Sequence, residues 1–267
     1  MTTILDELVE GAREETEARR RKVPVSRLES RFPDGVRSMR DALSAPGLSV
    51  IAECKKASPS QGVIREAYHP GEIAEMYEEA GAAAVSVLTE NRQFLGGLEH
   101  LVEARSRCSL PLLRKDFIVD EYQLFEARAA GADAVLLIAT VLDRHQLRDL
   151  MQAARELDLE CLVELYAASE LDRVDFDLCT ILGVNNRNLN TFEVDRDHAP
   201  AVLAHAPAGV IRVAESGLRT AQDLAAVAEA GIDAVLIGET FMRAGHPGDA
   251  LNRLREETER LLLERSE

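Results

Sequence analysis

The chain has 267 residues, of which 46% are hydrophobic, and it carries 47 acidic against 31 basic side chains, a formal net charge of −16 at pH 7. So acidic a protein repels nucleic acid and anionic membranes, which argues against both as partners. An anionic substrate would need a local cluster of positive groups. The length suits one large domain or two small ones, and the acidic excess fits either solubility or adaptation to salt.

The first 46 residues differ from the rest and are predicted to form a helical extension. Ile4, Leu5, Leu8 and Val9 form an apolar stripe with helical spacing, and a second helix is predicted over Val36–Leu43. The N-terminus carries acid early and lacks the basic start and apolar core of a signal peptide. No apolar run is long enough to span a bilayer. We therefore expect a cytoplasmic protein.

The cysteines and histidines show no pattern typical of a metal site. No two cysteines form a C-x-x-C pair, and the six histidines are scattered along the chain. We expect reduced thiols that serve packing, and no structural metal. The cysteines are Cys54, Cys108, Cys161 and Cys179.

From residue 49 the chain repeats a junction between a helix and a strand. At Gly81, Gly131 and Gly231 an Ala-Gly pair closes a predicted helix, and a run of Val, Leu and Ile follows almost at once. The first two glycines lie 50 residues apart and the last two 100. A βα unit of about 25 residues fits both gaps, and eight such units fill about 200 residues.

Eight apolar runs are predicted as strands, with helices between them. Continuous apolar strands that alternate with helices indicate a parallel sheet buried on both faces, and eight of them close a (β/α)8 TIM barrel. An open doubly wound sheet is the alternative, but no G-x-G-x-x-G follows any strand. We predict one domain over residues 1–267, in which residues 1–46 precede the barrel. The strands are expected near 49–53, 84–88, 111–115, 134–138, 160–164, 181–184, 210–214 and 234–237, and the helices include Pro70–Ala80, Glu121–Ala130, Arg144–Leu157 and Ala221–Ala230.

Polar side chains collect where the predicted strands end. Glu53 and Lys55 lie two residues apart, which places both on one face of the first strand, before the loop sequence Ser-Pro-Ser-Gln-Gly. A single such pair could be a structural salt bridge. Because five strands end this way, and buried charges are costly unless paired, a functional site at the barrel mouth is the better interpretation. The other residues of this ring are Lys115, Glu164, Asn185, Arg187, Glu215 and Ser216.

Two glycines after the last two strands indicate a phosphate site. Gly217 and Gly238 follow the seventh and eighth strands, where barrels of this type often bind phosphate through backbone amides. Lys55 could supply the countercharge.

Four segments together resemble indole-3-glycerol phosphate synthase. They are Ile51-Ala-Glu-Cys-Lys-Lys-Ala-Ser-Pro-Ser60, Leu113-Arg-Lys-Asp-Phe-Ile-Val119, Gly183-Val-Asn-Asn-Arg187 and Ala214-Glu-Ser-Gly217. The resemblance covers essentially the whole chain, including the N-terminal helices. It implies a carboxy-lyase that closes the indole ring of 1-(2-carboxyphenylamino)-1-deoxyribulose 5-phosphate, with loss of carbon dioxide and water, and that uses no metal or cofactor.

The resemblance also implies roles for individual residues. Lys115 is expected to be the general acid of ring closure, Glu164 the base or charge partner, and Lys55 active in dehydration or near the phosphate. The implied catalytic residues are Glu53, Lys55, Lys115, Glu164, Asn185 and Ser216. The implied substrate-binding residues are Ser58, Phe94, Phe117, Ile138, Arg187 and Glu215, and the implied phosphate-binding residues are Lys55, Gly217, Gly238 and Glu239.

Some of these residues have alternative interpretations. Phe94, Phe117 and Ile138 could serve only core packing. Glu239 occupies a position that is often Ser in the family, and its side chain is expected to point away from the phosphate.

We expect a monomer that acts on a phosphorylated small molecule.

Two other functions would also fit a phosphate-binding barrel. Phosphoribosylanthranilate isomerase usually uses a Cys and Asp pair, whereas the first strand here carries Glu53 and Lys55. A non-catalytic phosphosugar-binding barrel would not require the complete set of Lys and Glu residues.

Overall fold

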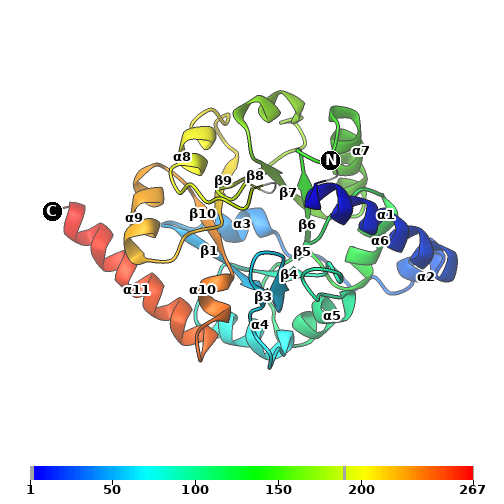
Figure 1. Cartoon of the computed structure of the whole chain (residues 1–267), viewed down its shortest axis with the longest axis horizontal. Coiled ribbons are helices and arrows are strands. Elements are labelled where there is room, and N and C mark those ends of the chain that lie inside the picture. Colours follow the sequence, from blue (N-terminus) through cyan, green and yellow to red (C-terminus); the bar gives the residue numbers. More distant parts are fainter. Residues whose placement is uncertain (1–2, 189–190, 267) are drawn as a thin grey trace.

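The eight apolar runs form a closed barrel of parallel strands (Figure 1). The computed structural model describes residues 3–188 and 191–266. Around the barrel the strand order is β1-β10-β9-β8-β7-β6-β5-β4, so each strand pairs with its neighbour in sequence and β10 closes the ring onto β1. The strands are β1 (Ser49–Cys54), β4 (Ala84–Leu88), β5 (Leu112–Lys115), β6 (Ala134–Ile138), β7 (Glu160–Leu165), β8 (Ile181–Asn185), β9 (Ile211–Glu215) and β10 (Ala234–Ile237).

Helices surround the barrel, and α11 runs along its outside beside α9 and α4 (Figure 1). Between β7 and β8 the connection contains only a 3₁₀ segment, η1, instead of a full α-helix. The outer elements are α4 (Pro70–Glu79), α5 (Leu98–Arg107), α6 (Tyr122–Ala129), α7 (Arg144–Glu156), η1 (Ala168–Arg173), α8 (His198–Leu203), α9 (Ala221–Glu229), α10 (Glu239–Met242) and α11 (Pro247–Ser266).

Three helices precede the barrel: α1 (Ile4–Lys22), α2 (Val25–Glu29) and α3 (Met39–Leu43). Leu5, Leu8 and Val9 of the α1 stripe are buried in the same hydrophobic cluster as the barrel interior, and the partly buried Ile4 packs against it. Met39 and Leu43 of α3 belong to that cluster too, and Ser38 and Arg40 bind Glu160 at the start of β7. Helix α3 therefore covers the amino-terminal end of the barrel.

The period of two along each strand decides which side chains reach the mouth. Ile51, Leu113, Leu162 and Val213 point into the barrel interior. Two residues later on the same strands, the inward face carries Glu53, Lys115, Glu164 and Glu215. Of the side chains between them, Ala52, Val163 and Ala214 belong to the larger hydrophobic core against the surrounding helices, whereas Arg114 is a buried charged group.

The predicted barrel is confirmed, and each expected strand matches an observed one to within one residue at each end. The stretch after β1 that was expected to be a loop contains a short hairpin, β2 (Ala57–Ser58) paired with β3 (Gly62–Val63). Gly62, the first residue of β3, has a positive φ of 63°, which glycine adopts without strain. Helix α2 was not expected from the sequence.

All four cysteines are buried and none forms a disulfide. Within residues 3–188 and 191–266, no helix has the length and hydropathy that crossing a membrane requires.

Candidate active site

A pocket opens at the carboxyl ends of the barrel strands, with an empty volume of about 1080 Å³ that includes open solvent. All of the candidate site residues from the sequence line it. The closed barrel brings these residues together at one site.

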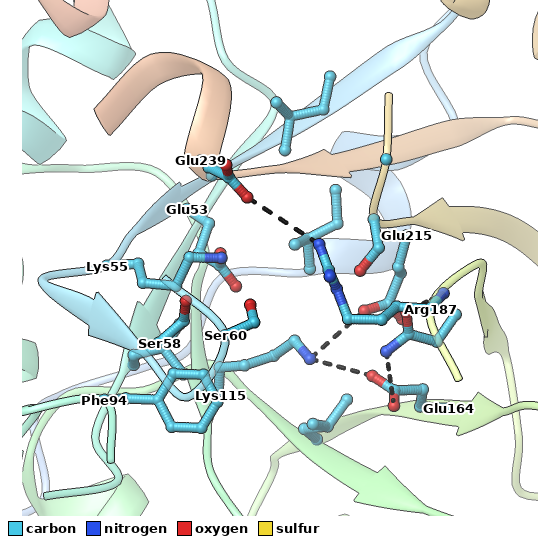
Figure 2. A pocket seen from close by; sticks show the side chains of 18 of the residues that line it. Glu53, Lys55, Ser58, Ser60, Phe94, Lys115, Glu164, Arg187, Glu215 and Glu239 are labelled. Carbon is cyan, nitrogen blue, oxygen red and sulfur yellow. Dashed lines mark hydrogen bonds and ion pairs between the residues drawn. The ribbon is translucent and has the colours of Figure 1, made fainter. Parts of the chain in front are cut away.

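Lys115 lies at the centre of the pocket between two carboxylates (Figure 2). Its Nζ is 3.0 Å from Glu164 Oε2 and 3.4 Å from Glu215 Oε2. Asn185 Nδ2 donates to the other oxygen of Glu164 at 3.3 Å. The Glu164 carboxylate is thus held from both sides.

Burial and neighbouring charges shift the protonation of this cluster. Burial alone would lower the pKa of Lys115, but the carboxylates of Glu164, Glu215 and Glu53 outweigh it and raise that pKa well above its ordinary value. Burial raises the pKa of Glu215 to about 8, an effect that Lys115 opposes and the Glu164 carboxylate reinforces. Lys115 therefore keeps its charge, and burial favours the neutral form of Glu215.

The raised pKa of Glu215 predicts a pH-dependent stability. Between its ordinary pKa of 4.5 and about 8, the folded protein keeps this proton while the unfolded chain loses it, so stability falls as pH rises through that window. Glu215→Gln cannot titrate, and its stability relative to the parent should increase from about pH 5 to about pH 8. Urea unfolding at both pH values measures this, with Glu229→Gln on the outer surface as control. Parallel pH curves for parent and Glu215→Gln would contradict the assignment.

Two glycines, Gly183 in β8 and Gly238 directly after β10, leave room for the buried carboxylates. A Cβ atom on Gly183 would lie 2.3 Å from Glu215 Oε1, and one on Gly238 would lie 2.1 Å from Glu53 Oε2. Glu53 in turn pairs with Lys55 at 2.6 Å. The absence of a side chain at these two positions therefore helps to fix where both carboxylates sit.

Gly183→Ala is expected to move the Glu215 carboxylate and, through it, Lys115. Since a misplacement of about 1 Å at a catalytic group can cost about 10² in rate, kcat should fall by about tenfold to a hundredfold. Gly245→Ala is the matched control, because a Cβ there meets nothing within 4 Å. Both variants are compared by steady-state kinetics and thermal unfolding. An unchanged kcat in a folded Gly183→Ala protein would show that Glu215 tolerates the shift.

One wall of the pocket is apolar. It includes Phe94, Phe117 and Ile138, of which the last two are buried. The loop of Phe94 is held by Glu90, whose carboxylate accepts hydrogen bonds from the backbone N–H of residues 92, 93 and 94 at 2.8–2.9 Å. This wall offers a flat aromatic ring a place to pack.

The opposite side of the pocket is built from the turns after β9 and β10. Ser216 and Gly217 both have positive φ, 67° and 78°, and the carbonyl of Ser216 accepts a hydrogen bond from Asn186 Nδ2 at 3.1 Å. A Cβ atom on Gly217 would lie 2.4 Å from Val194 Cγ1, so this turn needs glycine for space as well as for conformation.

Glu239, whose side chain was expected to point away from the phosphate, faces three arginines at the rim of the pocket. It lines the mouth, with Oε2 3.9 Å from Arg187 Nη2, and it also faces Arg219 and Arg243 (Figure 2). The reason is electrostatic, because three guanidinium groups surround its position.

Several pocket residues were missed by sequence reasoning. They come from loops, where no strand periodicity shows which way a side chain points. Glu90 is the one that the sequence indicates best as a pocket residue, since it follows the end of the second barrel strand almost directly. The missed residues include Ser60, Glu90, Phe192 and Arg219.

No group of three or more His, Cys, Asp or Glu side chains in the described ranges is arranged to hold a metal ion.

Solved structures with a similar fold share little sequence with this chain. The tryptophan synthase subunit alpha of Legionella pneumophila matches with a TM-score of 0.62 at 13% identity, over 85% of this chain and 98% of that one. Orotidine 5′-phosphate decarboxylase of Pyrococcus horikoshii matches with a TM-score of 0.58 at 14% identity, over 79% and 99% of the two chains. At this identity the likeness concerns the fold alone.

Sequence comparisons are more specific. The family model for indole-3-glycerol phosphate synthase matches residues 5–254. The indole-3-glycerol phosphate synthase of Salinibacter ruber is 52% identical over 263 residues, which covers 97% of each chain. That of Albidiferax ferrireducens is 46% identical over 260 residues, with 95% of this chain and 98% of the relative covered. The resemblance inferred from the motifs is thereby confirmed, and this chain belongs to the indole-3-glycerol phosphate synthase family of carboxy-lyases in tryptophan biosynthesis.

Proposed function

We propose that the pocket closes the indole ring of 1-(2-carboxyphenylamino)-1-deoxyribulose 5-phosphate with Lys115 as the general acid. The observation that carries this proposal is the position of Lys115 Nζ between Glu164 and Glu215 at the centre of the pocket. In ring closure, the aromatic carbon that bears the carboxylate attacks the ketone carbon, and the ketone oxygen must gain a proton. A charged ammonium at that oxygen stabilises the developing negative charge and donates the proton.

The arrangement of the cluster suits this role. The carboxylate oxygen nearest to Lys115 Nζ is Glu164 Oε2 at 3.0 Å, and Glu215 Oε2 lies farther away at 3.4 Å. Glu164 can therefore support the ammonium and later accept a proton. Neither side-chain oxygen of Glu215 has a hydrogen-bond partner among the described residues, which leaves this carboxyl group able to bind a substrate hydroxyl.

The remaining steps need no group beyond acids and bases. Carbon dioxide leaves, and the electrons of the broken C–C bond restore the aromatic ring. The new hydroxyl then departs as water when one acid protonates it and one base removes the proton from the adjacent carbon. Lys55, paired with Glu53 at 2.6 Å, is proposed for this dehydration. Asn185 and Ser216 orient the substrate and the catalytic groups.

The substrate's outer groups fit the two sides of the pocket. The aromatic ring is proposed to pack on Phe94, Phe117 and Ile138, and Arg187 and Ser58 to bind polar groups of the substrate. The phosphate is proposed to bind the amides near Gly217 and Gly238, within reach of Lys55.

The test is direct. The purified protein, without added metal or cofactor, is incubated with the anilino-deoxyribulose phosphate while indole fluorescence is recorded. We expect fluorescence to increase and carbon dioxide to be released in equal amount. Tight binding of the substrate with no turnover would instead favour a non-catalytic phosphosugar-binding barrel.

A single chain supplies every group named above, which supports a monomer and a single domain. Light scattering after size exclusion tests this, and an obligate oligomer that loses activity on dilution would contradict it.

A further inference from the structure

Glu239 brings a negative charge to the side of the pocket where an anion is proposed to bind. It directly follows Gly238, its side chain lines the pocket, and three arginines surround its carboxylate. Arg243 Nε donates to Oε1 at 3.1 Å. Arg187 Nη2 and Arg219 Nη2 each lie 3.9 Å from a carboxylate oxygen.

The three contacts are unequal. The Arg243 contact has the length of a hydrogen bond, whereas the two at 3.9 Å are beyond that range and are looser ion pairs. Arg187 and Arg219 line the pocket, while Arg243 lies outside its lining and also binds Gln61 of the β2–β3 turn at 2.7 Å. The carboxylate thus has one firm partner away from the pocket and two loose partners facing it.

We propose that Glu239 is an internal counter-ion for Arg187 and Arg219 that the substrate phosphate must replace, so that this residue sets the affinity for phosphorylated ligands. The inference rests on the proposed phosphate position at Gly217 and Gly238, which is adjacent to Glu239. A phosphate there and the carboxylate repel each other. The phosphate, with more charge and three acceptor oxygens, binds a guanidinium more strongly than a carboxylate at 3.9 Å does.

Arg243 makes this exchange feasible. When phosphate attracts Arg187 and Arg219, the Glu239 carboxylate keeps its hydrogen bond to Arg243, one helical turn away on the outer side. No charge is left without a partner, and the side chain stays near the rim. Figure 2 shows Glu239 facing Arg187 and apart from Lys115 and Glu164. The Glu239 side chain is 22% exposed, against 14% for Lys115 and 3% for Glu164. The exchange therefore changes binding and leaves the reacting groups in place.

The test is Glu239→Gln, which removes the charge and keeps the shape of the side chain. KM for the phosphorylated substrate and the inhibition constant of inorganic phosphate should both decrease, by about three- to tenfold at low ionic strength. The effect on kcat should be much smaller. Because salt screens repulsion between partly exposed charges, the difference from the parent should shrink at about 1 M salt.

Glu229→Gln is the matched control, since it makes the same change in net charge at an exposed ion pair on the outer surface. It should leave both constants unchanged. If Glu239→Gln raises KM and the phosphate inhibition constant, the carboxylate organises the arginines for the ligand and the proposal is wrong. The proposal is also overturned if KM and the phosphate inhibition constant are the same in the parent and in Glu239→Gln. Phosphate binding is measured by calorimetry as well, so that the inference is tested even if the parent fails to turn over the substrate.

Discussion

Lys115→Ala should lower kcat by about 10² to 10⁴, the usual cost of losing a general acid. The side chain ends inside the pocket, on the inward face of β5, so the fold should survive. KM should change much less, because the proposed binding groups for the ring and the phosphate are elsewhere. Steady-state kinetics with indole fluorescence measure the effect, and circular dichroism checks the fold.

Lys115→Arg distinguishes a need for a proton donor at this position from a need for a positive charge alone. A guanidinium keeps the positive charge beside Glu164, but it does not release its proton near neutral pH. The arginine variant should therefore remain nearly as slow as the alanine variant. If Lys115→Ala instead retains kcat while KM rises sharply, Lys115 is a binding residue and the proposed role is wrong.

The barrel was predictable because its strands are buried on both faces and alternate regularly with helices. The same regularity made the centre of the pocket predictable. Once Leu113 and Leu162 are placed inside, the period of two also puts Lys115 and Glu164 inside. Their convergence follows from closing the sheet, which brings the carboxyl ends of all strands to one mouth.

The directions of the side chains at the rim of the pocket could not be predicted from the period of the strands. The direction of Glu239 depends on Arg219 and Arg243, whose positions are set by two separate connections. The role of Gly183 is likewise invisible in sequence, since it depends on the position of Glu215 on the next strand. Such features depend on contacts between side chains that no local pattern encodes.

The neighbouring positions 114 and 115 show the same limit. Both are basic, and the period of two places Lys115 inside and Arg114 outside, but it does not show which partners Arg114 contacts there. Lys115 faces the pocket, whereas Arg114 is only 1% exposed and faces outward between the barrel and α6. There Arg114 Nη2 donates to Asp116 at 2.9 Å, and its Nη1 donates to the Gln123 carbonyl at 2.7 Å and to Glu126 at 3.4 Å.

Arg114→Met is therefore expected to be the most destabilising single change considered for this chain. It leaves the buried carboxylates of Asp116 and Glu126 without their shared cation, and breaking a buried ion pair in this way costs about 3–5 kcal/mol. Part of the network remains, since Arg19 Nε still donates to Glu126 at 2.6 Å and Thr89 to Asp116 at 2.7 Å. Urea unfolding gives the free energy of unfolding for comparison with the parent.

Arg148→Met provides the matched control, because Arg148 makes a surface ion pair with Asp175 at 3.3 Å and its side chain is 67% exposed. Surface pairs of this kind contribute about 0–1 kcal/mol, so the control should unfold nearly like the parent. If the two variants lose equal stability, the Asp116 and Glu126 carboxylates must be neutralised by their remaining partners or by protonation. In that case Arg114 would not be what holds β5 and α6 together around the catalytic lysine.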